Sequence, residues 1–372
     1  MSNGLRLALS VEALEPRLTG IGRYCLELAR RMPLEPGMED VRFFRGKHWV
    51  TDPEALLAEH WRPTRVRRWR STIEAWRHRR FAAGAVVHGP NFFLPEWAER
   101  GVATVHDLSV FHFPETHPVE RVRAFERDFL RSIGQASAII TDCATVKDEL
   151  VAMFGVAADR ITAVPLGVTP PTIAPEAVAD SLAGMGLAGM GSTEGGYALC
   201  VSTFEPRKRI DLLLAAYARL EPALRRRTPL VLAGASGWRN EALNAAIAVA
   251  QAEGWVRRLD YVPEGQLQAL YAGARLFVYP SQYEGFGLPP LEAMAHGVPT
   301  LVGNSACLAE VTRGAARVID PRDEAGFAEA LASALEDEAW QAEAGAAGRA
   351  VAAGYGWPEC IARTISVYET TI

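Results

Sequence analysis

The feature that most restricts the fold of this chain is an alternation of short apolar runs with longer helical patterns. Runs such as Leu5–Val11, Val102–His106 and Ala138–Asp142 are separated by segments with helical periodicity, for example Gly22–Met32 and Pro118–Gly134. Alternation of this kind is typical of parallel β-sheets covered by helices. The sequence therefore predicts an α/β protein.

A stretch rich in proline and glycine, near residues 170–196, divides this alternation into two series. The second series begins at Tyr197, and its expected strands include Leu259–Val262 and Leu276–Tyr279. A chain of 372 residues is long enough for two domains. Apolar residues spaced three to four apart in the tail predict a final helix. We predict one domain over 1–175, a second over 176–354, and a C-terminal helix over 355–372.

Composition restricts the class of protein further. Apolar residues make up 49% of the chain, which is enough for two cores. The sequence has no apolar run of about 18 residues that would suggest a transmembrane helix, and its first residues do not resemble a secretion signal. The five cysteines are widely spaced and contain no Cys-x-x-Cys pair, so neither a metal site nor a disulfide framework is expected. These features predict a cytoplasmic protein.

The segment from Ser281 to Ala295 combines two carboxylates with the beginning of a helix. Glu284 stands before a Gly-x-Gly loop, two prolines then mark a first helical turn, and Glu292 follows inside the helix. A helix N-terminus with glycine-permitted close approach can bind a diphosphate, and nearby carboxylates can accept hydrogen bonds from hydroxyls. The segment is therefore compatible with a nucleotide sugar. A plain strand–loop–helix connection is the alternative.

Two adjacent cations, Arg207 and Lys208, follow the first strand of the second domain. Cations at the carboxyl end of a parallel strand face the crevice in which such sheets bind ligands. There they could neutralise the negative charge that develops on a departing diphosphate. Lys208 stands out because only Lys47 and Lys147 accompany it among many arginines. The alternative is an ordinary solvated loop.

Three strand ends of the first domain carry further candidates. His106 closes one strand, and a histidine there can donate or accept hydrogen bonds near neutral pH. Gly20 and Gly22 form a Gly-x-Gly between the first strand and helix, but Cys25 stands where a dinucleotide fingerprint needs glycine, so NAD binding is not supported. His88 and Asn91 end another strand, as acceptor-side candidates or parts of a capped turn.

The segment Trp61–Phe81 holds eight arginines, three tryptophans and a single acidic residue. Basic residues interleaved with aromatic ones suit an anionic membrane surface, and they would also suit nucleic acid. A solvated helix with its aromatic residues facing a core is the third interpretation. We expect peripheral contact with an anionic membrane and no nucleic-acid partner.

The segment around Glu284 and Glu292, together with Leu276–Ser281 before it and His296–Pro299 after it, resembles the Glu-seven residues-Glu signature of family 4 retaining glycosyltransferases. That resemblance spans essentially the whole chain. It implies the GT-B fold, in which two Rossmann-like domains face each other across a cleft and the last helix crosses back to the first domain.

The same resemblance implies a role for each candidate residue. Lys208 would bind the diphosphate as in the Glu-Pro-Arg-Lys variant of the family's donor loop, while Thr203 stands where the commoner pattern has an arginine that Arg207 would replace. Glu284 would hold sugar hydroxyls and Glu292 the ribose. The remaining implied contacts to the donor or transferred sugar come from His106, from the glycine loop at Gly20 and Gly22, and from the amides of Phe286, Gly287 and Leu288.

The implied activity is a retaining, metal-independent hexosyl transfer in the assembly of a bacterial surface polysaccharide. The expected donor is a nucleotide sugar, with GDP-mannose as first choice, and the expected acceptor is a glycan or a polyprenyl-diphosphate-linked glycan. No other cofactor and no metal are expected. The alternatives are a nucleotide-sugar epimerase or hydrolase of the same fold and a non-catalytic nucleotide-sugar-binding protein. A PLP-dependent phosphorylase would need a Schiff-base lysine, and Lys208 is the only lysine of the second domain.

Overall fold

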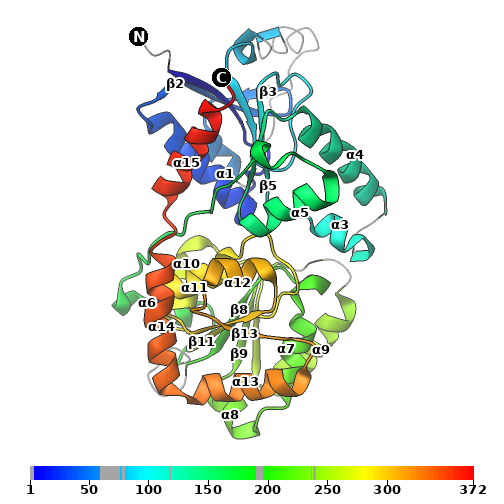
Figure 1. The fold of residues 1–372 in the computed structure, drawn as a ribbon. Coiled ribbons are helices and arrows are strands. Elements are labelled where there is room, and N and C mark those ends of the chain that lie inside the picture. The colour runs from blue at the N-terminus through cyan, green and yellow to red at the C-terminus, as the bar shows by residue number, and fades with distance from the viewer. Residues whose placement is uncertain are drawn as a thin grey trace. The chain divides into compact units, whose positions relative to one another are not determined.

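The computed structural model describes residues 4–58, 76–77, 80–116, 119–189, 196–235, 237 and 240–372. The chain forms two compact units (Figure 1). Unit 1 comprises Met1–Gly167 and Trp357–Ile372, and unit 2 comprises Val168–Gly356. Most of the segment Trp61–Phe81 lies outside the described residues.

Unit 1 contains a seven-stranded sheet in the order β3-β2-β1-β4-β5-β6-β7. All its pairings are parallel except that of β2 with β3. Its strands are β1 Leu5–Ser10, β2 Met38–Arg45, β3 His48–Val50, β4 Val86–Gly89, β5 Gly101–Val105, β6 Ala138–Thr141 and β7 Ile161–Ala163. Strand β3 was not expected from the sequence.

The helices of unit 1 come from both of its chain segments. Its α-helices are α1 Gly20–Arg31, α3 Ser109–His112, α4 Val119–Gln135, α5 Ala144–Phe154 and α15 Trp357–Glu369. Its 3-10 turns are η1 Met32–Leu34, η2 Pro53–Leu57, η3 Pro114–Thr116 and η4 Ala158–Arg160. Helix α15, shown in red in Figure 1, packs on α1 and β6. Trp357, Ile361 and Tyr368 of this helix are buried. They lie on the same face of the helix, which explains the three-to-four residue spacing of apolar residues in the tail.

Unit 2 contains a six-stranded parallel sheet in the order β10-β9-β8-β11-β12-β13. Its strands are β8 Ala198–Val201, β9 Leu230–Ala233, β10 Val256–Leu259, β11 Leu276–Tyr279, β12 Thr300–Gly303 and β13 Arg317–Ile319. Numbered within the unit, this is the doubly wound order 3-2-1-4-5-6, in which the chain reverses its direction of travel between β8 and β11.

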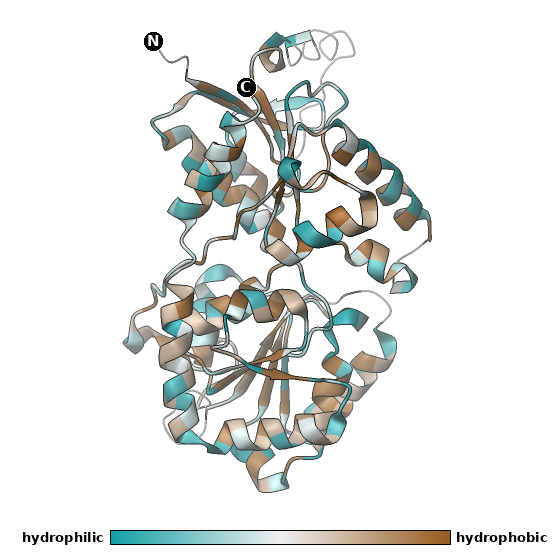
Figure 2. Cartoon of the chain, in the orientation of Figure 1, coloured by the Kyte–Doolittle hydropathy of each residue, from teal (hydrophilic) through white to brown (hydrophobic). Residues whose placement is uncertain are grey.

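The helices of unit 2 cover both faces of this sheet. They are α6 Pro175–Gly184, α7 Ile210–Ala218, α8 Pro222–Arg227, α9 Glu241–Ala252, α10 Glu264–Ala272, α11 Leu288–Ala295, α12 Ala306–Thr312, α13 Glu324–Glu336 and α14 Glu338–Ala352. Successive strand residues point to opposite faces: Cys200 packs with α7, α9 and α13, whereas Leu199 packs with α6, α10, α11 and α12. Both faces are therefore apolar, and the strands appear as brown runs in Figure 2.

Two details differ from the sequence-based expectations. The expected strand Leu259–Val262 is wrong: β10 is Val256–Leu259, because Arg257 and Arg258 interrupt the apolar pattern although their backbones pair with β9. The first unit ends at Gly167 rather than at 175, and the second at Gly356 rather than 354. Val168 donates a backbone hydrogen bond to the carbonyl of Tyr355, so these residues belong to unit 2.

Within the described ranges, no helix is long and apolar enough to cross a bilayer. The same residues contain no group of three or more His, Cys, Asp or Glu side chains that could hold a metal ion. All five cysteines are buried as free thiols.

Candidate functional site

The strand order of unit 2 marks the place where a ligand is expected. Strands β8 and β11 lie side by side at the sheet's centre, and the chain leaves them toward opposite edges. The loops that follow such a pair of strands separate, and they leave a crevice at the carboxyl edge of the sheet. The loop after β8 contains Arg207 and Lys208, and the loop after β11 contains Glu284.

The backbone joins these two loops. The carbonyl of Arg207 accepts a hydrogen bond from the amide of Gln282 at 3.0 Å, and the Arg207 guanidinium donates to the carbonyl of Tyr283 at 2.9 Å. The 3-10 turn η5, Pro206–Lys208, ends at Arg209, whose φ of 51° lies in the left-handed region. A non-glycine residue there is strained, and such strain is common at functional sites.

Lys208, Arg207 and Glu284 form one ionic cluster. The Lys208 ammonium lies 2.5 Å from Glu284 Oε1 and donates to the Tyr279 hydroxyl at 2.9 Å. Arg207 lies 3.6 Å from Glu284 Oε2, and its Nε donates to Glu205 Oε2 at 3.2 Å. Hence two cations share Glu284, although only 6% of Lys208 and 7% of Glu284 is exposed.

Burial and charge act against each other on the ionisation of this cluster. Burial by itself raises the pKa of Glu284, but the charges of Lys208 and Arg207 outweigh burial and hold that pKa below its usual 4.5. Burial, followed by the repulsion from Arg207, lowers the pKa of Lys208 from its usual 10.5, while Glu284 partly offsets this. An additional anion at the cluster would therefore favour the charged form of Lys208.

Helix α11 begins next to this cluster in sequence. Its N-cap, Gly287, has φ 104°, and a Cβ there would come within 2.7 Å of Leu308, so the position needs glycine. No side chain caps this N-terminus, and the prolines at 289 and 290 carry no amide hydrogen. Backbone amides of Phe286, Gly287 and Leu288 supply the donors of this turn, as the sequence suggested for an anion site.

Glu292 lies inside α11. Its Oε2 accepts a hydrogen bond from the Tyr271 hydroxyl at 2.7 Å, and the residue is half-buried. The ring of His296, one helical turn further on, lies 5.4 Å from the Tyr271 ring. Burial lowers the pKa of His296 to about 4, which keeps this imidazole neutral at physiological pH.

In unit 1, each ring nitrogen of His106 has a hydrogen-bond acceptor beside it. Nδ1 lies 2.7 Å from Asp142 Oδ2, at the end of β6, and Nε2 lies 2.8 Å from the carbonyl of Pro90. Burial lowers the pKa of His106, but the charge of Asp142 and these hydrogen bonds outweigh burial and raise that pKa above 6.5. The ring packs edge-on against Tyr24 and against Phe92, whose φ of 66° is a second strained backbone position.

His88 is not available to an acceptor substrate, contrary to the sequence-based suggestion. It is fully buried: Nδ1 lies 2.7 Å from the Tyr368 hydroxyl of α15, and Nε2 lies 2.8 Å from Thr104 Oγ1. Burial, and then His106, lower its pKa to about 3, so it is a neutral link between the sheet and the C-terminal helix. Sequence alone cannot show this contact, because its partner is 280 residues away.

The glycine loop of unit 1 forms the first turn of α1. Gly20 is its first residue and is exposed, while the Thr19 side chain accepts a hydrogen bond from the amide of Gly22 at 3.3 Å. A Cβ at Gly22 would come within 2.9 Å of the Ala13 carbonyl, so this glycine lets the loop after β1 pack on the helix. That is a local structural reason for Gly22.

Three residues of these sites were not singled out from the sequence: Asp142, Tyr279 and Glu205. Asp142 directly follows a strand, as His106 does, and its position at a parallel strand's carboxyl end was the available signal. Tyr279 is the one hydroxyl-bearing residue of the apolar strand β11. Glu205 stands two residues before Arg207 and also accepts a hydrogen bond from Thr203 at 2.7 Å. Thr203 therefore holds the Glu205 carboxylate in place through this hydrogen bond.

Several solved structures share this fold, among them those of WaaG and HepE. The structure of WaaG, a glycosyltransferase involved in lipopolysaccharide biosynthesis, matches with a TM-score of 0.74 at 17% identity, covering 97% of this chain and 99% of WaaG. HepE from Anabaena, in complex with UDP and glucose, matches with a TM-score of 0.71 at 14% identity, covering 98% of this chain and all of that one. At such identities the likeness establishes the fold.

Sequence comparison establishes the family. The profile of "Glycosyl transferases group 1" matches residues 192–351, which include the ionic cluster and α11. The O-antigen chain mannosyltransferase B of Escherichia coli is 38% identical over 98% of this chain and 100% of its own length. The mannosyltransferase WbdA of Escherichia coli is 31% identical over 63% of this chain. This chain belongs to the group 1 glycosyltransferases, and it is a hexosyltransferase of GT-B fold.

Proposed function

We propose that this enzyme transfers mannose from GDP-mannose, with retention of anomeric configuration, to a glycan or lipid-linked acceptor of a bacterial surface polysaccharide. The observation that carries this proposal is the full-length similarity to an O-antigen chain mannosyltransferase. The cluster of Lys208, Arg207 and Glu284 at the switch point of unit 2 supports a nucleotide-sugar donor.

In this proposal unit 2 binds the donor. Lys208 and Arg207 neutralise the diphosphate as it leaves, and the amides of Phe286, Gly287 and Leu288 donate to its oxygens. Glu284 accepts hydrogen bonds from sugar hydroxyls, and Glu292 accepts them from the ribose. The short distance between Lys208 and Glu284 supports these roles, because it brings a phosphate-binding cation and a hydroxyl-binding carboxylate together.

Unit 1 binds the acceptor in this proposal, and His106 contacts the transferred sugar. The acceptor hydroxyl attacks the anomeric carbon on the face from which the diphosphate departs. The bond from that carbon to the diphosphate oxygen breaks, a bond to the acceptor oxygen forms, and the acceptor proton passes to the departing diphosphate. The raised pKa of His106 supports a charged ring that donates to a sugar oxygen after it exchanges its hydrogen bond to Pro90.

A panel of nucleotide sugars tests the donor. Wild-type protein is mixed with GDP-mannose, GDP, UDP-glucose or UDP, and the melting temperature is recorded. A ligand at a hundred times its dissociation constant should stabilise the fold by about 2.7 kcal/mol. Transfer to a mannosylated acceptor is then followed by NMR of the anomeric proton. Stabilisation by UDP-glucose and not by GDP-mannose would contradict the donor, and an inverted product would contradict retention.

The same assay separates transfer from the alternative activities. An epimerase or hydrolase would consume GDP-mannose at the same rate without acceptor, whereas a transferase needs the acceptor for rapid GDP release. A binding protein without catalytic activity would leave GDP-mannose intact under both conditions.

We also propose that transfer needs no metal, because fixed cations stand at the proposed diphosphate site. EDTA should leave the initial rate unchanged. Loss of activity in EDTA with recovery in magnesium or manganese would contradict this part of the proposal.

The last part of the proposal is peripheral association of the enzyme with an anionic membrane. Its support is the excess of arginine in the sequence Trp61–Phe81. Binding to liposomes that is released by salt would support it, and equal binding to neutral liposomes would contradict it.

A further inference from the structure

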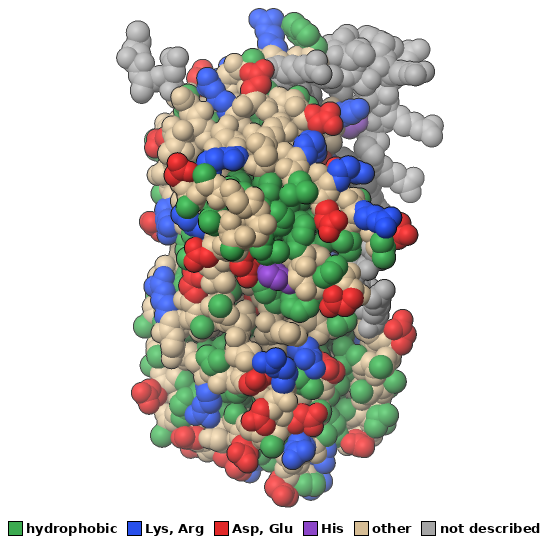
Figure 3. All heavy atoms as spheres, turned by 45° about the vertical axis from the view of Figure 1, so that its right-hand side comes forward, with side chains coloured by type: hydrophobic (Ala, Val, Ile, Leu, Met, Phe, Trp, Pro, Cys, Tyr) green, Lys and Arg blue, Asp and Glu red, His purple; other side chains and the backbone are tan. Residues whose placement is uncertain are grey.

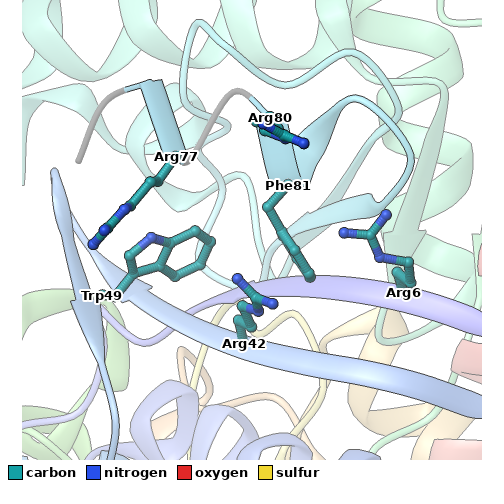
Figure 4. A pocket seen from close by; sticks show the side chains of 6 residues that line it. All are labelled: Arg6, Arg42, Trp49, Arg77, Arg80 and Phe81. Atoms are coloured by element: carbon teal, nitrogen blue, oxygen red, sulfur yellow. The ribbon is translucent and has the colours of Figure 1, made fainter. Parts of the chain in front are cut away.

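Four arginines of unit 1 line one pocket that contains none of the donor-site residues. The pocket has a volume of about 500 Å³ and is lined by Arg6, Arg42, Trp49, Arg77, Arg80 and Phe81 (Figure 4). Arg6 belongs to β1, Arg42 to β2 and Trp49 to β3, whereas the other three precede β4. We call it the arginine pocket.

The sheet explains why two of these arginines lie together. Arg6 pairs in register with Asp40, and Arg42 follows Asp40 by two residues, so Arg6 and Arg42 emerge on the same face of adjacent strands. Phe81 packs on that face, with the Arg6 guanidinium 4.6 Å and the Arg42 guanidinium 4.2 Å from the centroid of its ring. Figure 4 shows Arg42 between Trp49 and Phe81, with Arg6 beyond Phe81.

The guanidinium groups of Arg6 and Arg42 lie over an aromatic ring. Phe81 is only 3% exposed, and its ring meets the Trp49 ring edge-on at 5.6 Å. A guanidinium stacked on a ring keeps its N–H groups in the plane of the fork, where they can reach an anion at the edge. Arg42 and Arg6 thus present donors toward the pocket at little cost in side-chain entropy.

Within the described part of the chain, the positive charge of the pocket exceeds the negative charge that pairs with it. Arg42 pairs with Asp40 at 2.7 Å. Among the residues that the structure describes, the side chains of Arg6, Arg77 and Arg80 make no hydrogen bond or ion pair, although the Arg6 backbone pairs with β2. On the face of the molecule drawn in Figure 3, in contrast, positive and negative side chains are interspersed. Like charges held in one place repel each other, and an anion placed among them removes that repulsion.

We infer that the arginine pocket binds a phosphate or diphosphate group. Planar guanidinium forks bind phosphate oxygens in pairs, and four of them around one cavity suit a group with two or more negative charges. The pocket shares no residue with the ionic cluster of unit 2. Arg6 lies near the amino end of β1, whereas His106 and Asp142 follow the carboxyl ends of their strands. It is therefore a second anion site, separate from the ionic cluster of unit 2 and from His106 and Asp142, and it includes Arg77, Arg80 and Phe81 of the segment proposed to contact a membrane.

The phosphate could belong to a lipid headgroup or to a free phosphate compound, and two probes distinguish them. Calorimetry measures the affinity for inorganic diphosphate in saturating GDP, which occupies the proposed donor site. Co-sedimentation measures binding to vesicles of phosphatidylcholine alone and of phosphatidylcholine with phosphatidylglycerol. If binding to the anionic vesicles is competed by diphosphate, the ligand is a headgroup. Diphosphate binding without vesicle binding indicates a free phosphate compound.

The variant Arg42→Gln/Arg80→Gln tests the residues, and Arg219→Gln/Arg226→Gln is its control. The control removes the same charge from exposed positions of unit 2. The pocket variant should bind the active probe at least about tenfold more weakly, because it loses two charge-assisted contacts, and the control should bind as wild type does. If the double variant does not fold, the single variant Arg77→Gln replaces it in the test. Arg77 is exposed and is not one of the two arginines over the Phe81 ring, and its loss should weaken binding about threefold. Equal binding by pocket and control variants, or no binding of either probe to wild type, would overturn the inference.

Discussion

The polar residues at the carboxyl strand ends of the two units are organised in different ways. In unit 2, two cations and two carboxylates gather at the switch point, with Lys208 and Arg207 on opposite oxygens of Glu284. In unit 1, one ion pair, His106 with Asp142, lies beside a neutral chain from Tyr24 through Thr104 and His88 to Tyr368.

The difference shows which chemistry each unit can support. A cluster that carries two positive charges can bind a doubly charged diphosphate, because the anion offsets the desolvation of the cations. A buried network of hydroxyls and a neutral imidazole holds position and shape, but it offers little to an anion. Changes in the unit 2 cluster should therefore affect turnover most, whereas changes in unit 1 should mainly affect positioning and stability.

The largest effect is expected for Lys208→Ala. Turnover should fall by about a hundredfold or more, as is typical when one donor that stabilises transition-state charge is removed. Steady-state kinetics with GDP-mannose and acceptor gives the ratio. The exposed Lys47→Ala is the matched control, and it should keep wild-type turnover. A Lys208→Ala enzyme within threefold of wild type would remove Lys208 from the mechanism.

Glu284→Gln should separate sugar transfer from nucleotide binding. The amide keeps the shape but accepts hydrogen bonds more weakly, so kcat should fall roughly thirtyfold, equivalent to about 2 kcal/mol. The affinity for GDP, measured by calorimetry, should change little because Lys208 and Arg207 remain. Glu329→Gln is an exposed control. Loss of GDP affinity with normal turnover would reverse the assigned roles.

Glu292→Gln should lower the affinity for GDP more than it lowers kcat. Its carboxylate is proposed to hold the ribose, so GDP should bind about tenfold more weakly, the effect of losing one charge-assisted hydrogen bond. Tyr271→Phe removes the hydrogen bond that Glu292 accepts but keeps its carboxylate, and should leave GDP affinity near that of wild type. If both variants lose affinity equally, Glu292 acts by packing with Tyr271.

The smallest effect is expected for Asp142→Asn in unit 1. An amide oxygen at this position can still accept a hydrogen bond from His106 Nδ1, so kcat/KM should fall only about fivefold, which corresponds to about 1 kcal/mol. Without the carboxylate, the pKa of His106 should fall, and the limb of the pH–rate profile that reports His106 should move to lower pH. An unshifted limb would mean that Asp142 does not set the ionisation of His106.

The pH dependence of the melting temperature should also follow the ionisation of His106. The pKa of His106 is raised in the fold, so its contribution is fully present below its unfolded value near 6.5 and is lost as pH rises through the folded pKa. Wild type should therefore exceed Asp142→Asn in melting temperature most clearly in mildly acidic buffer. The exposed Asp148→Asn is the control, and it should follow wild type at each pH.

The sequence by itself determined the two α/β series, the family and the loops that carry the site. Alternating apolar runs specify parallel strands because both faces of such a sheet are buried, as Leu199 and Cys200 show. Glu284, Gly287 and Glu292 fall within one stretch of chain, so their spacing was visible before any fold was known. Local patterns of this kind do not depend on distant partners.

Only the tertiary structure decided which side chains meet. Lys208 and Glu284 are 76 residues apart, and their contact depends on β8 lying next to β11. The sequence suggested that His88 contacts the acceptor substrate. In the fold, Tyr368 of α15 instead forms a hydrogen bond with the His88 ring, and His88 is a buried link between the sheet and that helix. The arginine pocket likewise needs β1, β2 and the segment before β4 on one face. Strand order brings these residues together, and it arises from long-range packing that no local pattern records.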